Sequence, residues 1–370
     1  MTLLFVYLKN FRSHKNSKLN FSDGINYIVG GNGQGKTSVL ESIYYLCTTK
    51  GYNSKSDSEV VRFNENEFEV EGLFRDLTQN NVRIFFSSAE NRKYYFLNNK
   101  QITYSANVIG KFPIVLLTPA GHSITQGSPS ERRRFVDSVI SQSNNAYLKN
   151  MLDYNKTLRQ RSNLLMQIKE NKRKILFDEL EAWTEKLIDT GSEIIKQRIN
   201  FIRNFNEFVK SSYEVIMGND EIPTIKYSFL EDRKNENIKE MFVNLLNEKK
   251  DEELRRTANL IGPHRDDFIF EINGYNLRKY GSMGQHKTFQ VVLRFAEFFY
   301  LKEITGKTSL FLLDDVFGEL DINRAQKISN YLRCVGQAFI TLTDFTNMSY
   351  LEKKDNDNVI KINQGQIIND

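Results

Sequence analysis

The fold of this chain is decided by the stretch Gly30-Gly31-Asn32-Gly33-Gln34-Gly35-Lys36-Thr37. The stretch fits the phosphate-binding loop pattern G-x-x-x-x-G-K-[ST] at every fixed position. Alternating apolar residues over 25–29 predict a strand before the loop, and apolar residues at helical spacing over 39–46 predict a helix after it. Because strand, glycine loop and helix are the setting that the motif requires, we favour a phosphate site over the alternative, a chance glycine turn.

The chemistry of such a loop follows from its backbone. Glycines let N–H groups turn toward an anion, and the helix start adds unpaired donors and the positive end of the helix dipole. We expect Lys36 to reach the β- and γ-phosphates of ATP, and the Thr37 hydroxyl to hold Mg²⁺. The expected ATP-binding residues are Gly30, Gly31, Asn32, Gly33, Gln34, Gly35, Lys36, Thr37 and Ser38.

Length and composition narrow the class of protein. The 370 residues suffice for two or three domains with a large core, and the formal net charge is +5. No apolar run approaches the roughly 18 residues that a membrane span needs, and the first residues lack the basic segment of a secretory signal. Cys47 and Cys334 form no metal-type spacing. A cytoplasmic protein with no membrane partner is the expectation.

Basic residues gather between positions 149 and 174, with only two carboxylates among them. A cluster of this kind can neutralise nucleic-acid phosphates, although a solvated helix face is the alternative. A second basic run covers positions 132–134, and its arginines would alternatively hold one part of the fold onto another. The candidate DNA contacts are Arg132, Arg133, Arg134, Lys149, Lys156, Arg159 and Arg161.

Strand patterns occupy both ends of the chain and helical patterns its middle. Apolar alternation over 68–86 predicts an antiparallel sheet, and the continuous apolar runs 114–117 and 310–313 predict strands buried on both faces. Between about 129 and 257 the pattern is mostly helical, with two long amphipathic helices expected to form an antiparallel arm. We therefore predict one half of a core domain at 1–126, an inserted helical arm at 127–257, and the other half of the core at 258–370.

The apolar run 310–313 ends in Asp314-Asp315, which is the form of a Walker B strand. A carboxylate at this strand end can hold the Mg²⁺ bound by Thr37, and the next can orient or deprotonate an attacking water. We assign Asp314 to Mg²⁺ and Asp315 to catalysis. An acidic strand end in an ordinary α/β fold is the alternative.

Ser282-x-Gly284-Gln285 at a helix start has the form of the signature of ABC-type ATPases. Its hydroxyl and backbone N–H groups would supply donors to a γ-phosphate, although a plain helix cap is the alternative. Residues 318–321, after the Walker B strand, resemble the D-loop and place Asp321 there. In ABC-type ATPases the signature of one subunit completes the phosphate-loop site of another, so that ATP joins two copies and hydrolysis releases them.

The chain resembles the RecF family of DNA repair and recombination proteins over nearly its whole length. The matching segments are 8–12, 30–43, 127–137, 262–267 and 312–321. Generic ABC proteins lack the segments at 127–137 and 262–267. The resemblance implies an α/β fold: a P-loop ABC-type ATPase head, split and SMC/Rad50-like, with an inserted helical arm.

The resemblance also implies a function. Members bind double-stranded DNA and gap junctions, dimerise with ATP, hydrolyse it slowly, help load the recombinase with RecO and RecR, and contribute to replication and the SOS response. One alternative is the ATPase subunit of an ABC transporter, which the 246 positions between Lys36 and Ser282 disfavour. The other is an SMC- or Rad50-type structural scaffold, which needs a longer coiled coil than 151–209 allows.

Three features depart from the family or ABC pattern. Ala120 stands where the family usually carries an acidic residue, and the segment 48–52 is poorer in arginine than expected. Thr343-Asp344 occupies the place of the ABC-type switch histidine. His264 is interpreted as part of a structural motif, not as a catalyst.

Overall fold

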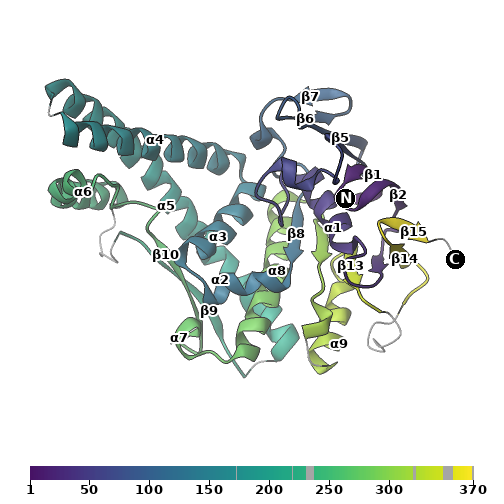
Figure 1. Cartoon of the computed structure of the whole chain (residues 1–370). Coiled ribbons are helices and arrows are strands. Elements are labelled where there is room, and N and C mark those ends of the chain that lie inside the picture. Colours follow the sequence, from purple (N-terminus) through teal and green to yellow (C-terminus); the bar gives the residue numbers. More distant parts are fainter. Residues whose placement is uncertain (172, 219, 231–236, 320–321, 345–352, 369–370) are drawn as a thin grey trace. The chain divides into compact units, whose positions relative to one another are not determined.

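The computed structural model describes the chain except for residues 172, 219, 231–236, 320–321, 345–352 and 369–370 (Figure 1). It divides into two compact units, which we call the head unit and the arm unit. The head unit comprises Met1–Gly121, Glu214–Gly218 and Val291–Asp370. The arm unit comprises His122–Tyr213 and Asn219–Gln290.

The first sheet of the head unit is antiparallel, in the order β2-β1-β4-β5-β6-β7. Alternating burial along β4 follows the apolar alternation expected of a sheet with one face on the core. The strands are β1 (Thr2–Phe11), β2 (His14–Asn20), β4 (Glu67–Arg75), β5 (Gln79–Ser87), β6 (Arg92–Leu97) and β7 (Lys100–Ile102).

The second sheet of the head unit has the order β15-β14-β3-β13-β12-β8 and is parallel except for the edge strand β15. Its strands are β3 (Ile25–Val29), β8 (Ile114–Leu117), β12 (Leu310–Leu313), β13 (Ala338–Leu342), β14 (Asn358–Asn363) and β15 (Gln366–Ile368). All four residues of β12 are buried, as its continuous apolar run predicts. Because β3, β13 and β12 are parallel neighbours, their carboxyl ends meet at one edge of the sheet.

Helix α1 (Lys36–Thr48) lies between the two sheets, with contacts to β1, β4 and β5 on one side and to β8 and β13 on the other. Its buried Val39, Leu40 and Ile43 belong to one hydrophobic core with residues of both sheets. This packing fixes the helix start at the carboxyl end of β3. The other elements of the head unit are η1 (Asp57–Val60), η2 (Ser105–Asn107), η3 (Pro119–Gly121), η5 (Phe317–Glu319) and α9 (Ile322–Leu332).

The arm unit is mainly helical and contains a small antiparallel sheet in the order β11-β10-β9. Its helices are α2 (His122–Gln126), α3 (Pro129–Ser143), α4 (Asn145–Glu170), α5 (Lys174–Met217), α6 (Ile238–Arg256) and α7 (Leu277–Tyr280), and the last residues of α5, from 214 on, belong to the head unit. Its strands are β9 (Pro223–Ser228), β10 (Asp267–Ile272) and β11 (Tyr275–Asn276). Helix α8 (Met283–Thr305) begins in this unit, and its later part belongs to the head unit.

The two long helices α4 and α5 run antiparallel, as expected. Their hydrogen bonds join Asn144 to Gln197, Asn150 to Thr190 and Arg161 to Thr184, so that the partner number falls as the chain advances along α4. The predicted inserted helical arm is therefore present, and Figure 1 shows both helices.

The unit boundaries differ in part from the predicted ones. The break between Gly121 and His122 lies close to the expected break at 126/127, but residues 258–290 remain in the arm unit and do not join the head at 258. The reason is strand pairing: β10 pairs with β9 in register, with Phe268 opposite Tyr227, which ties this segment to the arm. None of the described helices is both long and apolar enough to cross a membrane.

Candidate nucleotide-binding site

The glycine loop lies between β3 and α1, as predicted, and its backbone needs glycine at two points. Gly35 ends the loop with φ 104°, and a Cβ there would lie 2.5 Å from Ser13 Oγ and 2.9 Å from His14 Nε2. At Gly30 a Cβ would lie 2.3 Å from the carbonyl oxygen of Ile362. Larger residues would push the loop away from the β1–β2 turn and from β14, so the close approach is built into the motif.

A cavity of about 260 Å³ opens over the loop. Its lining residues are Ser13, Asn32, Gly33, Gly35, Lys36, Thr37, Ser38, Asp315 and Thr341. The Lys36 ammonium donates to the carbonyl oxygens of Gly30 (2.6 Å) and Gly31 (2.9 Å), so it lies over the loop. Burial lowers the pKa of Lys36, and the carboxylates of Asp315 and Asp314 oppose that shift. A polyphosphate bound in this cavity would therefore contact the Lys36 ammonium, which lies between the loop and the carboxylates of Asp314 and Asp315.

Asp314 lies at the end of β12, and its two oxygens have different partners. Oδ1 accepts from the Thr37 hydroxyl at 3.0 Å and from the Thr341 hydroxyl at 2.9 Å. Oδ2 accepts from the Tyr52 hydroxyl at 2.9 Å. A hydroxyl and a carboxylate within hydrogen-bond distance are the hard oxygen ligands that Mg²⁺ prefers, and Mg²⁺ commonly takes one or two carboxylates together with substrate phosphates. Thr37 and Asp314 therefore fit the ion that the motif implies.

Asp315 has a left-handed backbone, with φ 52°. Its N–H donates to the Thr341 hydroxyl at 2.8 Å, and its side chain is exposed at the cavity. Left-handed conformations at residues other than glycine are uncommon and cluster at functional sites. Asp315 lines the cavity together with Lys36 and Thr37, which is where a base acting on water would be needed.

Two residues of this site were missed by the sequence analysis. Thr341 lies at the end of β13, whose parallel pairing with β12 puts Ile340 opposite Leu313 and hence Thr341 next to Asp314. The order of the strands would have been needed to see this. Tyr52 lies in a segment of irregular structure that carried no motif, and its contact is made with a residue 262 positions away.

The predicted signature residues Ser282, Gly284 and Gln285 lie in the arm unit at the start of α8. Gln285 N donates to Ser282 Oγ at 3.2 Å, and Ser282 N donates to Gln285 Oε1 at 2.9 Å. These reciprocal bonds form a capping box. The amide of Gln285 also donates to Glu221 Oε1 at 2.7 Å. The serine is exposed and held by the cap at a helix N-terminus, so the cap and the signature interpretations are compatible.

Comparison with known proteins identifies the family. The family model for the RecF/RecN/SMC N terminal domain matches residues 2–367. A protein of Chloroherpeton thalassium named "DNA replication and repair protein RecF" is 42% identical over 357 residues, covering 93% of this chain and 95% of that protein. A protein of Acetivibrio thermocellus with the same name is 36% identical over 344 residues and covers 92% of each. The chain belongs to the RecF family.

Solved structures agree with this membership. The structure of "the recombination mediator protein RecF-ATPrS in RecFOR pathway" has a TM-score of 0.90 and 33% identity, and covers 99% of this chain and 97% of that one. The Smc head domain of Pyrococcus furiosus, at 16% identity and a TM-score of 0.55, shows likeness of fold alone. The predicted α/β head of SMC/Rad50 type with an inserted helical arm is confirmed.

In this RecF-family chain, two of the three clustered arginines serve the fold. Arg132 is buried and makes a two-pronged ion pair with Asp267, with Nε–Oδ1 at 2.7 Å and Nη2–Oδ2 at 2.9 Å. Arg133 donates to the carbonyl oxygen of Asp266 at 2.6 Å. Both join α3 to the start of β10, so the prediction of Arg132 as a DNA contact is wrong. Arg134 remains exposed, with its guanidinium on Glu131.

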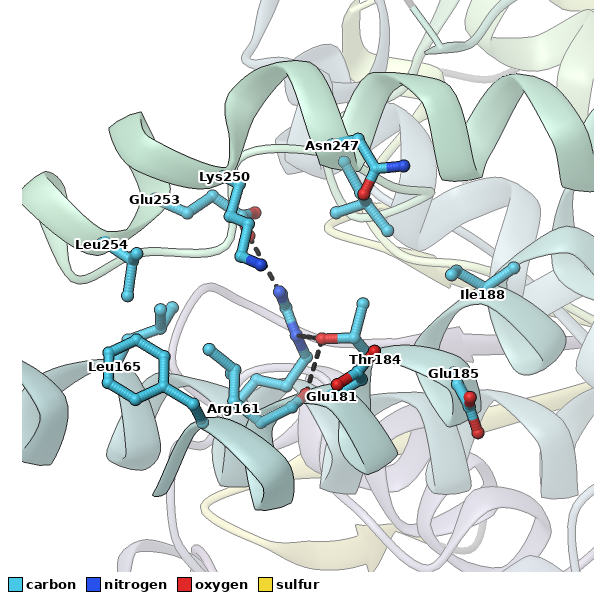
Figure 2. A pocket seen from close by; sticks show the side chains of 13 residues that line it. Arg161, Leu165, Glu181, Thr184, Glu185, Ile188, Asn247, Lys250, Glu253 and Leu254 are labelled. Atoms are coloured by element: carbon cyan, nitrogen blue, oxygen red, sulfur yellow. Dashed lines mark hydrogen bonds and ion pairs between the residues drawn. The ribbon is translucent and has the colours of Figure 1, made fainter. Parts of the chain in front are cut away.

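The predicted basic residues of α4 also divide. Lys149, Lys156 and Arg159 are exposed and stay candidates. Arg161 is buried at 3% exposure, and its donors reach Thr184 Oγ1 (3.0 Å), Glu253 Oε2 (2.8 Å) and the amide oxygen of Asn259. Figure 2 shows its guanidinium aimed into the cavity of about 220 Å³ that α4, α5 and α6 line. The prediction of Arg161 as a DNA contact is therefore wrong, because its guanidinium is buried inside the arm unit and its donors are bonded there.

His264 is structural in this chain, as interpreted from the sequence. Its Nδ1 lies 2.7 Å from the Tyr154 hydroxyl, and its Nε2 lies 3.2 Å from the carbonyl oxygen of Asn259. Burial lowers the pKa of His264 to about 4, so the ring is neutral at physiological pH. The predicted D-loop residue Asp321 lies outside the described residues.

Proposed function

We propose that the chain is an ATP-dependent DNA-binding protein of recombinational repair, in which ATP and Mg²⁺ join two copies on double-stranded DNA. The observation that carries the proposal is the contact of the Thr37 hydroxyl with Asp314 at 3.0 Å, at the mouth of a glycine loop that also holds Lys36. Loop, lysine, hydroxyl and carboxylate are the parts that P-loop NTPases use to bind Mg²⁺ and a nucleoside triphosphate.

The residues have distinct tasks in this proposal. Backbone N–H groups of the loop and the start of α1 bind the phosphates, and Lys36 neutralises the β- and γ-phosphates. Thr37 and Asp314 hold Mg²⁺, which supplies positive charge to the transferring phosphoryl group. Asp315 orients the attacking water. The cap Ser282–Gln285, whose serine is exposed, offers its donors to the γ-phosphate bound by a second copy, which makes the nucleotide a link between two chains.

Two observations favour this function over the alternatives. RecF relatives carry names that speak of DNA replication and repair, and the similar solved structure with ATP is described as a recombination mediator in the RecFOR pathway. The longest described helix has 44 residues, which is about 66 Å at 1.5 Å per residue, and is short for an SMC- or Rad50-type scaffold. Action with RecO- and RecR-type partners at gapped DNA belongs to the proposal on the strength of these relatives.

Sedimentation velocity tests the proposal. The chain should shift from monomer toward dimer when ATP, Mg²⁺ and double-stranded DNA are present, and Lys36→Ala should abolish the shift because the phosphates lose their cation. Lys100→Ala, at an exposed position on β7, is the matched control and should behave as the wild type. A wild type that stays monomeric with ATP and DNA would refute the dimer.

DNA binding is tested separately, by titration with and without ATP at two salt concentrations. Affinity that falls steeply with salt is expected, because phosphate contacts release counterions. Salt-insensitive or undetectable binding would favour the transporter alternative.

A further inference from the structure

Tyr52 makes a contact at the metal-binding carboxylate that no motif accounts for. It lies between α1 and η1 and is partly buried. Its hydroxyl donates to Asp314 Oδ2 at 2.9 Å and lies 3.4 Å from the carbonyl oxygen of Thr37. Its ring packs edge-on against Tyr44, with centroids 5.5 Å apart. The phenol therefore touches both residues that are assigned to Mg²⁺.

The segment that carries Tyr52 is held in place by a partly buried ion pair. Arg12 donates to both oxygens of Glu41, with Nε–Oε2 at 2.9 Å and Nη2–Oε1 at 3.1 Å, and Glu41 is 1% exposed. Glu41 Oε1 also accepts from Asn53 N at 3.3 Å. At Gly51 a Cβ would lie 2.5 Å from the same oxygen, so only glycine lets the chain pass this close. The neighbours of Tyr52 are thus fixed on both sides.

The hydrogen bonds of Asp314 show what this fixed phenol does. Oδ1 already accepts from Thr37 and Thr341, which leaves Oδ2 to Tyr52. The tyrosine hydroxyl supplies the proton of this bond and the carboxylate oxygen accepts it, so Tyr52 is the donor in the contact. With both oxygens bonded, the carboxylate cannot turn about its Cβ–Cγ bond without losing a partner.

We propose that Tyr52 is a positioning residue for the divalent cation, holding Asp314 through Oδ2 so that Oδ1 stays directed at the Thr37 hydroxyl. This inference rests on the proposed nucleotide site and deepens it. Groups that orient a metal ligand through a hydrogen bond typically contribute 10–100-fold to metal affinity. The Tyr52 hydroxyl is bonded to the Asp314 carboxylate and to the carbonyl oxygen of Thr37, so we expect its removal to affect cation binding more than binding of the phosphates.

Tyr52→Phe tests the inference, since it removes the hydroxyl and keeps the ring against Tyr44. The readout is binding of a fluorescent ATP analogue while Mg²⁺ is titrated from an EDTA-treated sample. We expect the Mg²⁺ concentration for half-maximal enhancement to rise about 10–100-fold, with nucleotide affinity in EDTA unchanged. Tyr95→Phe is the matched control: it removes a buried hydrogen bond to the carbonyl oxygen of Leu46 in the same unit, 3.0 Å long, away from Asp314.

The outcomes separate the two proposals. An unchanged or lower Mg²⁺ requirement in Tyr52→Phe, with a Mg²⁺-dependent wild type, would overturn the positioning role alone. An equal rise in Tyr95→Phe would also overturn it, because general loosening of the head would then be the cause. A wild type that binds no nucleotide would overturn the proposed function and this inference with it. Thermal unfolding midpoints of the two variants, expected to match, check that both fold alike.

Discussion

Replacing Arg161 tests whether its charge serves the fold or DNA. The Arg161–Glu253 pair joins α4 to α6, with side-chain exposures of 4% and 3% and an N–O distance of 2.8 Å. Arg161→Met leaves the Glu253 carboxylate buried without its cation, while Leu260 N still donates to Oε1 at 2.7 Å. Breaking a buried pair by removing one partner costs about 3–5 kcal/mol. The expected loss in the free energy of unfolding is therefore about 3–5 kcal/mol.

The chain carries a natural probe for this measurement. Trp183, the single tryptophan, packs against the apolar cluster of Leu164, Leu165, Ile168 and Leu180 in the arm unit. Its fluorescence during urea unfolding reports on the arm. For a slope near 2 kcal/mol/M, the expected loss moves the urea midpoint down by roughly 1.5–2.5 M. Adding Glu253→Gln should restore much of the midpoint, because a neutral amide no longer needs a cation and still accepts from Leu260.

DNA binding supplies the contrast. Lys156→Met combined with Arg159→Met removes two exposed charges of the same helix, so the free energy of unfolding should stay within about 0.5 kcal/mol of the wild-type value. If α4 faces DNA, this double variant lowers affinity and reduces its salt dependence, whereas the Arg161→Met, Glu253→Gln double variant binds DNA as the wild type does. An Arg161→Met protein with an unchanged midpoint and weakened DNA binding would refute the structural role.

Two further predictions concern catalysis and pH. Asp315→Asn should keep ATP binding and slow ATP turnover, so that the ATP-bound dimer persists longer in sedimentation after a pulse of ATP. Asparagine tolerates the left-handed backbone at this position, where φ is 52°. Loss of ATP binding in this variant would mean that Asp314 and Asp315 have exchanged roles. The pKa of His264 is about 4 in the folded chain and 6.5 in the unfolded chain, so the fold favours the neutral ring. The contribution of this neutral ring to stability is therefore complete above pH 6.5 and is lost as the pH falls toward 4. The wild type should lose about 2 kcal/mol more than His264→Gln between pH 7.5 and 5, measured from urea midpoints; parallel curves would contradict this assignment.

The parts of the site that were predictable from the sequence are those formed by local motifs. The glycine loop, the acidic pair after β12 and the cap at Ser282 each consist of residues close together in the chain, so each can be recognised from its sequence pattern. The two long helices of the arm follow in the same way from a period of apolar residues that only a helix can bury on one face. The resemblance to the RecF family was likewise based on short contiguous segments of the sequence.

Tertiary structure decided what spacing leaves open. Whether a charged side chain is buried in an ion pair or exposed to solvent depends on its neighbours in space. Arg132 and Arg161 are buried against the carboxylates of Asp267 and Glu253. Lys156, in the same arm unit, is exposed. The return of the chain to the head depends on strand pairing, which keeps 258–290 with the arm.

Sequence motifs were enough to find the phosphate loop, its lysine and hydroxyl, and the carboxylate that we assign to the metal. Only the tertiary structure showed how that carboxylate is held, because Thr341 and Tyr52 reach Asp314 across 27 and 262 positions. The physical reason is that a hydrogen bond acts over about 3 Å in space, and no regularity in the sequence records which distant hydroxyls the sheet and the Arg12–Glu41 pair bring within that distance.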